Sequence, residues 1–485
     1  MIQLEEKTKP KPRFEKENPL KPEDLAAQRY GTREMVDIWG AEKTFEYSLR
    51  VQGISAKILS EMNPELVPPE QAEEIMEKAS LKYVNPDRIR KLEQETGHDI
   101  IALNTALEEV LSKEAATHVH KLKTSADVTQ PAKALQLKDS LEVIIDSVEN
   151  LRDITIEKSI EWMGIPHMDT SHLYDALPGV VGKPFAHYAE MLQSDLKVLK
   201  FTYDNSIIGK WADATGNHHS AKALGVDGVE LQKKYCEALG IGYMDAPAQI
   251  PGLEFEADIM YALARVGETM NNMAKYVAWG RSDDVNILIN ENPKKKKGSS
   301  AMPHKDSKNG NPTAEEQIMS IRNYLVGNVT TALMNCEFPY ARNLAASSNS
   351  RINYEDGFKY LDHGIRRLSN VLFHLGVREE RAKERVDRSF GVVTSQQVMS
   401  YLTDHQKVEN PMSRSKAHDL VAEIATEAWE TETEFYCALI EEEEITSRID
   451  DNTLIKITNA REYIGDSKRE VARVADKYYQ KKTLE

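Results

Sequence analysis

Residues 259–277, IMYALARVGETMNNMAKYV, decide the fold class of this chain. Apolar residues recur in this stretch every three or four positions, which is the period of one buried face of an α-helix. Elsewhere Glu, Lys, Ala, Leu and Met crowd the long segments, whereas the two-residue alternation of β-strands is hard to find. The sequence therefore predicts an all-α protein. The residues of the quoted helical face are Ile259, Leu263, Val266, Met270, Met273 and Val277.

The chain has 485 residues, which is more than one ordinary hydrophobic core, so we expect two or three structural units. Long helices with narrow apolar stripes need partners, which favours a helical bundle that associates with copies of itself. The first residues are rich in Lys, Glu and Pro and are typical of an extended arm. The predicted parts are an arm at 1–24, a helical domain at 25–122, a central bundle at 123–377 with a loop near 294–312, and a C-terminal helical domain at 378–485.

Charge and cysteine content exclude several classes of partner. The formal net charge of −16 argues against nucleic acid as a bulk electrostatic partner, so an anionic substrate needs a local cluster of Arg and Lys. Three widely spaced cysteines, Cys236, Cys336 and Cys437, indicate a reducing cytoplasm rather than a disulfide framework. There is no apolar run long enough for a membrane span or a signal peptide, so we expect no membrane partner.

The segment GSSAMPHK at 298–305, followed by Asn311-Pro312, carries groups suited to elimination chemistry. A hydrogen on the carbon beside a carboxylate is barely acidic, and its removal creates a dianion that only prearranged cations and donors stabilise. Lys305 and Asn311 are suited to that task. A hydroxyl deprotonated in a water-excluded, positively biased pocket is a strong base, and Ser299 is the candidate.

This segment resembles the signature of the fumarase/aspartase superfamily, whose members break C–N or C–O bonds of succinyl compounds and release fumarate. The resemblance implies a three-part, all-α fold with a long central bundle, places Ser300 and Met302 at the substrate, and implies no cofactor. The family usually has a single residue between the Lys and the Asn-Pro. Here five residues separate Lys305 from Asn311, so Asn309 stays open as the signature Asn. The alternative is a solvated Ser-rich loop after a run of lysines.

The stretch RYGTREMVDIW, which begins at Arg29, is similar to the opening of adenylosuccinate lyases. In that family the Arg-Tyr pair contacts the nucleotide phosphate, which implies this role for Arg29 and Tyr30. Arginine suits the task because its planar guanidinium binds phosphate oxygens in a bidentate manner. The alternative for an isolated Arg-Tyr pair is an ordinary surface position.

Two further motifs of the same family follow along the chain. The stretch TGHDI contains His98 and Asp99, and the resemblance places His98 near the leaving purine or a substrate carboxylate. A structural histidine at a helix start is the alternative. The stretch VHKLKTSADV contains Thr124 and Ser125, whose hydroxyls suit a carboxylate of the succinyl group. A helix N-cap is the alternative for these hydroxyls, and both roles are compatible.

The stretch SHLYDALP resembles the family segment that carries the general acid, and His172 stands at the position of that acid. Histidine is apt because its ordinary pKa near 6.5 lets it carry a proton at neutral pH. Ser171 stands where the family usually has Thr, and Tyr174 where it usually has Gln. The resemblance also implies that Glu316 orients this histidine and keeps it cationic.

Three more segments resemble the nucleotide-binding residues of adenylosuccinate lyases. Asn217 lies in the stretch ATGNH, and Gln249 follows at the family's spacing; either side-chain amide can bond a carboxylate or a base edge. The stretch RNLAASSNSRI places Arg342, Ser347 and Arg351 at the offsets of a phosphate clamp. The clamp favours a nucleotide substrate over aspartate or argininosuccinate.

The resemblance implies a carbon–nitrogen lyase that releases fumarate from adenylosuccinate, and from succinylaminoimidazole carboxamide ribotide, in purine biosynthesis. It also implies a homotetramer whose active sites combine segments of three subunits. Tyr174, Asn343 and the longer loop favour the alternative of a lyase for a different succinyl amine; a non-catalytic helical oligomer is the other alternative. A metal site at His218 and His219 is disfavoured because no Cys or paired carboxylate completes a ligand set. The predicted catalytic residues are His172, Ser299, His98, Lys305 and Glu316. The predicted substrate-binding residues are Arg29, Tyr30, Asp99, Thr124, Ser125, Asn217, Gln249, Ser300, Met302, Asn311, Arg342, Ser347 and Arg351.

Overall fold

The computed structural model describes residues 29–172, 174–292, 299–305, 310–337, 340 and 342–479. The predicted arm at 1–24 and the alternative signature residue Asn309 lie outside the described residues, as does the part of the predicted loop at 294–298.

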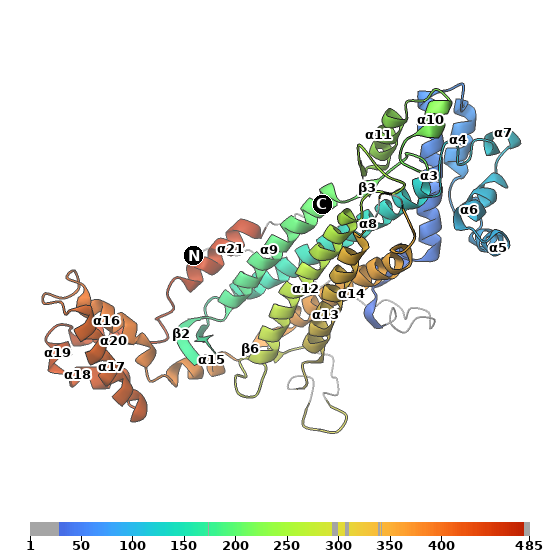
Figure 1. Ribbon diagram of the computed structural model, residues 1–485. Coiled ribbons are helices and arrows are strands. Elements are labelled where there is room, and N and C mark those ends of the chain that lie inside the picture. The colour runs from blue at the N-terminus through green and yellow to red at the C-terminus, as the bar shows by residue number, and fades with distance from the viewer. Residues whose placement is uncertain are drawn as a thin grey trace.

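The middle of the molecule is a bundle of long helices that lie side by side (Figure 1). This arrangement confirms the predicted all-α class with its long central bundle. The helical face predicted at 259–277 is confirmed as well, since all six of its residues are buried within one helix. The bundle helices are α8 (Ala126–Glu161), α9 (Gly182–Asn205), α12 (Glu254–Gly280), α13 (Thr313–Asn335) and α14 (Ser347–Phe373).

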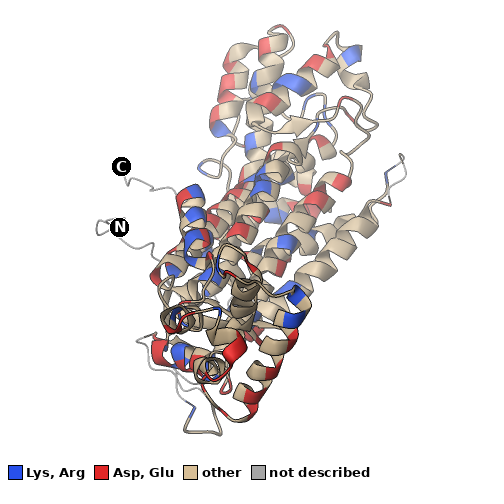
Figure 2. Cartoon of the chain, turned by 90° about the vertical axis from the view of Figure 1, so that its left-hand side faces the viewer, with Lys and Arg blue, Asp and Glu red and all other residues tan. Residues whose placement is uncertain are grey.

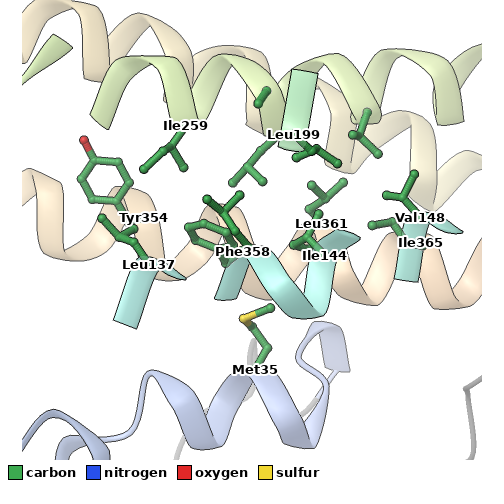
Figure 3. Close-up of a cluster of buried hydrophobic side chains, with 14 of the residues drawn as sticks. Met35, Leu137, Ile144, Val148, Leu199, Ile259, Tyr354, Phe358, Leu361 and Ile365 are labelled. Atoms are coloured by element: carbon green, nitrogen blue, oxygen red, sulfur yellow. The ribbon is translucent and has the colours of Figure 1, made fainter. Parts of the chain in front are cut away.

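One continuous hydrophobic core joins the bundle helices. Val148 of α8, Leu199 of α9 and Ile259 of α12 are fully buried and line one core with Phe358 and Ile365 of α14, Val148 lying beside Ile365 (Figure 3). Met35 of the short helix α2 (Arg33–Ile38) is equally buried and closes one side of this core. Burial of each such side chain stabilises the fold by about 1.5–3 kcal/mol. The bundle is therefore rigid, and it fixes the relative positions of the residues at its two ends.

A smaller helical part lies at the end of the bundle where α8 begins (Figure 1). It has a core of its own between Leu49 and Ala115. Segments from the middle of the chain pack at the same end, including a two-stranded parallel sheet formed by β3 and β4. The predicted domain boundaries stay a prediction. The elements are α3 (Ala41–Met62), α4 (Pro69–Lys78), α5 (Pro86–Thr96), α6 (Asp99–Glu108), α7 (Lys113–Ala116), β3 (Ile208–Gly209), α10 (His219–Ala223), α11 (Gly228–Leu239) and β4 (Gly242–Tyr243).

The opposite end of the bundle carries a β-hairpin and the C-terminal helices (Figure 1). The hairpin, β1 with β2, was not predicted, because His167 and Met168 are both buried and β1 lacks the alternation of a half-buried strand. The helices from α16 to α20 form a separate core, and α21 packs back on α9. The elements are β1 (Pro166–Ser171), β2 (Tyr174–Val180), β5 (Leu288–Asn290), β6 (Leu375–Val377), α15 (Glu379–Asp387), the 3-10 helix η1 (Val392–Thr394), α16 (Ser395–Thr403), α17 (Arg414–Glu430), α18 (Phe435–Ile440), α19 (Glu443–Thr446), α20 (Asp451–Ile457) and α21 (Ser467–Tyr478).

Basic and acidic residues are interleaved along the helices, with long uncharged stretches between them (Figure 2). Within the part of the chain that the structure describes, no helix combines the length and the apolar character that crossing a bilayer requires.

Candidate active site

The predicted site residues fall mainly into two groups at opposite ends of the bundle. Thr124 and Ser125 directly precede α8, whereas His172 follows its far end on the hairpin. Because α8 has 36 residues, the 1.5 Å rise per residue separates these two places by about 50 Å. We call them the binding end and the hairpin end. The binding end holds His98, Asp99, Thr124, Ser125, Asn217, Gln249, Arg342, Ser347 and Arg351, and the hairpin end holds His172, Ser299, Ser300, Met302, Lys305, Asn311 and Glu316.

Asp127 organises the binding end, although it was not among the predicted site residues. Its carboxylate is fully buried and accepts hydrogen bonds from the Nζ of Lys210 at 2.5 Å and from the backbone N–H of Thr124 at 2.8 Å. It also accepts from the N–H groups of Ala212 at 2.9 Å and Asp213 at 3.1 Å. One carboxylate thus joins the turn before α8 to the loop that leads to the predicted binding residue at 217.

The hydroxyl of Ser125 is not used to cap α8. Ser125 occupies the N-cap position, but its side chain makes no capping hydrogen bond. The carboxylate of Asp127 holds this turn instead, through the N–H of Thr124. The simple N-cap alternative is therefore wrong for Ser125, because its hydroxyl makes no hydrogen bond to the start of α8.

Arg342 is a half-buried cation that makes no ion pair within the described residues. Its Nη1 donates to the Oε1 of Gln249 at 2.9 Å, while its Nε is buried without a hydrogen-bond partner among the described residues. Burial lowers the pKa of Arg342. A buried guanidinium with a free N–H is suited to an anionic group of a ligand.

Two other basic side chains at this end, His120 and Lys123, were not predicted as site residues. The Nδ1 of His120 lies 3.1 Å from the Nε2 of Gln52, and the Nζ of Lys123 donates to the Oε1 of Gln52 at 2.9 Å. Lys123 also lies 4.7 Å from the ring centre of Trp211. Burial, with the charge of Lys123 next, lowers the pKa of His120 to about 4, and burial lowers the pKa of Lys123 to about 7. The signal that could have found them was their place just before Thr124.

His98 is the N-cap residue of helix α6, in agreement with the alternative of a structural histidine at a helix start. Its Nδ1 lies 3.5 Å from the N–H of Ile101 and 3.2 Å from the Oδ1 of Asp99. The side chains of His98 and Asp99 are 41% and 47% exposed, so both remain accessible to a ligand. The capping role therefore leaves room for the predicted one.

The remaining binding-end residues lie near helix starts or in exposed loops. Asn217 is exposed and donates to the Oγ1 of Thr215 at 3.1 Å. Ser347 is the first residue of α14, and Arg351 is exposed one turn later on the same helix face. Arg351 and Arg342 carry positive charge on a chain that is acidic overall, which attracts an anion locally.

The Arg29-Tyr30 pair lies along the side of the bundle, away from the other three clamp residues. The ring of Tyr30 packs edge-on against Tyr360 at 6.3 Å and His363 at 5.8 Å. Both partners are more than three turns along α14 from Ser347. Within one chain, the structure does not bring Arg29 to the predicted phosphate clamp.

At the hairpin end, His172 occupies the turn between β1 and β2. Ser171 pairs with Tyr174 in the antiparallel ladder, so His172 lies at the tip of the hairpin. His172 adopts φ 54°, a left-handed conformation that two-residue hairpin turns favour and that costs about 1–2 kcal/mol for an L-residue. The exposed imidazole therefore projects from the tip of a short, strained arm.

The described part of the signature loop brings two predicted residues into contact. The Nζ of Lys305 donates to the Oδ1 of Asn311 at 2.9 Å. The Oγ of Ser299 accepts from the N–H of Met302 at 3.1 Å and of Ala301 at 3.3 Å. These bonds use only the acceptor side of the hydroxyl, so its proton is not engaged by them. Ser300 and Met302 are exposed.

The two glutamates at the start of α13, Glu315 and Glu316, have different surroundings. Glu315 is buried and forms an ion pair with the Nη1 of Arg281 at 2.5 Å. The predicted residue Glu316 is exposed and makes no hydrogen bond with His172 within the described residues of this chain. Glu315 therefore anchors the start of α13 through its ion pair, whereas Glu316 faces outward.

No group of three or more His, Cys, Asp or Glu with metal-binding geometry occurs in the part of the chain that is described.

Comparison with known proteins gives matches over most of the chain. Residues 28–327 match the family model described as lyase, and residues 391–474 match the one described as adenylosuccinate lyase C-terminus. The adenylosuccinate lyase of Methanocaldococcus jannaschii is 30% identical over 438 residues, covering 90% of this chain and 92% of that protein. The adenylosuccinate lyase of Methanothermobacter thermautotrophicus is 29% identical over 449 residues, covering 92% and 97%.

Solved structures share the fold. A fumarate lyase from Mesorhizobium sp. BNC1 superposes with a TM-score of 0.78 at 20% identity, covering 92% of this chain and 98% of that one. A 3-carboxy-cis,cis-muconate lactonizing enzyme from Pseudomonas putida gives 0.79 at 18% identity, covering 94% and 99%. At these identities the likeness speaks for the fold alone.

Proposed function

This chain belongs to the adenylosuccinate lyase family, and we propose that it is a carbon–nitrogen lyase that releases fumarate from adenylosuccinate and leaves AMP. We further propose succinylaminoimidazole carboxamide ribotide as a second substrate, because the same bond is broken next to the same succinyl group. Both reactions belong to purine nucleotide biosynthesis.

The observation that carries this proposal is the character of the binding end. Arg342 is half-buried, has a free N–H and makes no ion pair within the described residues. The hydroxyl of Ser125 is not used by its helix. A phosphate and a succinyl carboxylate are the anionic groups that such a cation and such a hydroxyl bind well.

The hairpin end supplies the acid and the base of the proposed elimination. Ser299 removes the proton from the carbon beside a carboxylate, and Lys305 with Asn311 stabilises the dianion that forms. His172 protonates the departing nitrogen. The C–N bond electrons pass to that nitrogen, the new C=C bond completes fumarate, and no cofactor is required.

Self-association as a homotetramer with shared sites is part of the proposal. The two ends of one chain are about 50 Å apart, so an acid and a binding pocket have to come from different copies. An apolar surface suited to a partner runs along α13 and α14, where Val326, Leu333, Met334 and Ile352 are 43%, 60%, 72% and 63% exposed. Such exposure on helices of a bundle marks an interaction surface.

We propose that the enzyme works in the cytoplasm. The three cysteines are all free: Cys236 is buried, Cys336 half-buried and Cys437 exposed. An exposed thiol together with two unpaired ones suits a reducing compartment.

A lyase for a different succinyl amine is the second candidate, and Tyr174 favours it. Tyr174 is 80% exposed and stands two positions after His172 in the sequence, where the family usually has Gln. A large aromatic ring next to the acid would change the leaving group that fits.

Purified protein tests the two candidates directly. A spectrophotometric assay with adenylosuccinate, argininosuccinate and aspartate should show fumarate release from the first substrate alone. If the protein does not turn over adenylosuccinate, the second candidate, a lyase for a different succinyl amine, replaces the first.

Mixing two inactive variants tests the shared site. His98→Gln alters only the binding end and His172→Gln only the hairpin end, so mixed oligomers should contain some intact sites and recover part of the activity. Two variants of the same loop, Ser299→Ala and Lys305→Met, serve as the matched control and should recover no activity. Recovery in neither mixture, with both variants folded and oligomeric, would contradict shared sites.

A further inference from the structure

Arg385, on the first helix after the bundle, reaches the hairpin that carries His172. It lies on α15, whose Val386 is fully buried against Met168 of β1. From there its Nη2 donates to the Oδ1 of Asp175 on β2 at 2.7 Å. Two neighbouring residues of α15 therefore hold the hairpin, Val386 through β1 and Arg385 through β2.

The guanidinium of Arg385 is enclosed rather than solvated. The side chain is 11% exposed, and its Nε and Nη1 are buried without a hydrogen-bond partner among the described residues. Its charge centre lies 5.3 Å from the ring centre of Trp279 at the end of α12. The group is thus clamped between the bundle and the hairpin, and Asp175 is the one carboxylate that it bonds within the described residues.

Asp175 occupies a sensitive place in the hairpin. It pairs with Thr170, directly beside the register shift between Asp169 and Thr170, and it is three positions after His172 in the sequence. His172 itself holds a left-handed backbone conformation, which persists only where its surroundings restrain it. The two-stranded sheet is short, and an isolated hairpin of this kind is marginally stable.

We propose that Arg385 is a positioning residue, which fixes the hairpin through Asp175 and so sets the place of the acid His172. The proposal rests on the proposed function for the role of His172. It assigns to a residue of the C-terminal region a part in the reaction that neither the motifs nor the comparisons give it. The other arginine of α15 has no such reach, because Arg381 pairs with Glu384 on the same helix at 3.4 Å.

The test compares Arg385→Gln and Asp175→Asn with the matched control Arg381→Gln. A displacement of a catalytic group by about 1 Å costs on the order of 100-fold in rate, so both hairpin variants should lose about that factor in kcat. The KM for adenylosuccinate should stay near the wild-type value, because neither Arg385 nor Asp175 is among the predicted substrate-binding residues and their loss displaces the acid alone. The double variant should be no slower than the slower single one, since both changes break one interaction. The control should match wild type.

Arg385→Lys separates positioning from simple stability. It keeps the charge but lacks the planar fork, so an intermediate kcat with an unchanged KM supports positioning. Wild-type kcat in both Arg385→Gln and Arg385→Lys, with only a lowered melting temperature, overturns it. A rise in KM equal to the fall in kcat/KM also overturns it.

Amide hydrogen exchange provides a readout that does not depend on the substrate. Exchange at residues 166–180 should become faster in Arg385→Gln and Asp175→Asn, and should be unchanged in Arg381→Gln. If wild type does not cleave adenylosuccinate, the proposed function fails; faster exchange then still supports the hold on the hairpin, and unchanged exchange overturns it.

Discussion

Acidification is expected to affect the hairpin through two titratable side chains of β1, His167 and Asp169, which have opposite effects on stability. Single substitutions separate the two effects. The Nε2 of His167 lies 3.9 Å from the Oδ1 of Asp169 on the same strand, and the imidazole is 1% exposed. Burial, with the positive charge of Arg385 next, lowers the pKa of His167 to about 4, while the carboxylate of Asp175 opposes this shift. Burial raises the pKa of Asp169 to about 6, against the opposing charge of Lys183.

The sign of each contribution to the free energy of unfolding depends on whether the folded or the unfolded chain binds the proton at the higher pH. The unfolded chain protonates His167 near pH 6.5, well before the folded protein does, so stability present above pH 6.5 is lost as the pH falls through 4. The interval from 6.5 to about 4 corresponds to about 3 kcal/mol. Asp169 behaves in the opposite way, because the folded protein binds its proton first, and its contribution is fully present below pH 3.8 and lost as the pH rises through 6. Its side chain is 45% exposed, so solvent screening limits this contribution to about 1 kcal/mol.

Urea unfolding between about pH 7 and about pH 4, at one protein concentration, measures the three outcomes. Over this range wild type should lose about 2 kcal/mol, Asp169→Asn about 3 kcal/mol, and His167→Gln should instead gain about 1 kcal/mol. His405→Gln, at an exposed position, is the control and should follow wild type. Parallel curves for wild type and both hairpin variants would refute this account of the two groups.

Three further outcomes are expected. Ser299→Ala should abolish turnover while adenylosuccinate still binds, because the hydroxyl takes a proton only in the transition state; kinetics and equilibrium binding check this, and near-normal turnover would refute it. Arg351→Ala should raise the KM for adenylosuccinate by the equivalent of about 1.5–3 kcal/mol and affect the dephosphorylated substrate little, whereas equal losses on both would remove the phosphate from its role. Lys210→Met should lower the free energy of unfolding by about 3–5 kcal/mol, because the carboxylate of Asp127 then stays buried without its cation; a loss below about 1 kcal/mol in urea unfolding would contradict this.

The features that could be predicted from the sequence are those that depend on residues only a few positions apart. The three-to-four-residue spacing from Ile259 to Val277 is enough to define a buried helix face, and α12 has that face. It was not enough for the hairpin, because consecutive buried residues such as His167 and Met168 hide the period of a strand. The hairpin packs on α15, which lies far away in sequence.

Long-range pairs explain the site residues that sequence reasoning missed. Asp127 and Lys210 are 83 residues apart, and nothing local indicates that they meet in a fully buried ion pair. Adjacent residues on a helix pose a related problem, because a step of one residue turns the side chain by about 100°. A motif that ends near Glu315 and Glu316 does not tell which of them points inward, and the packing of Arg281 against Glu315 decides it.

The rigidity of the bundle constrains how the reaction can be assembled. Because α8 holds the binding end and the hairpin end about 50 Å apart, no small loop movement within one chain brings His172 to Ser125. A partner bundle packed antiparallel along α13 and α14 would place its hairpin end at the binding end of the first chain, and the reverse contact follows from two-fold symmetry. Activity should then depend on association, so specific activity should fall on dilution below the dissociation constant of the oligomer and return on concentration. A specific activity that stays constant while light scattering shows monomers would mean that one chain completes the site alone.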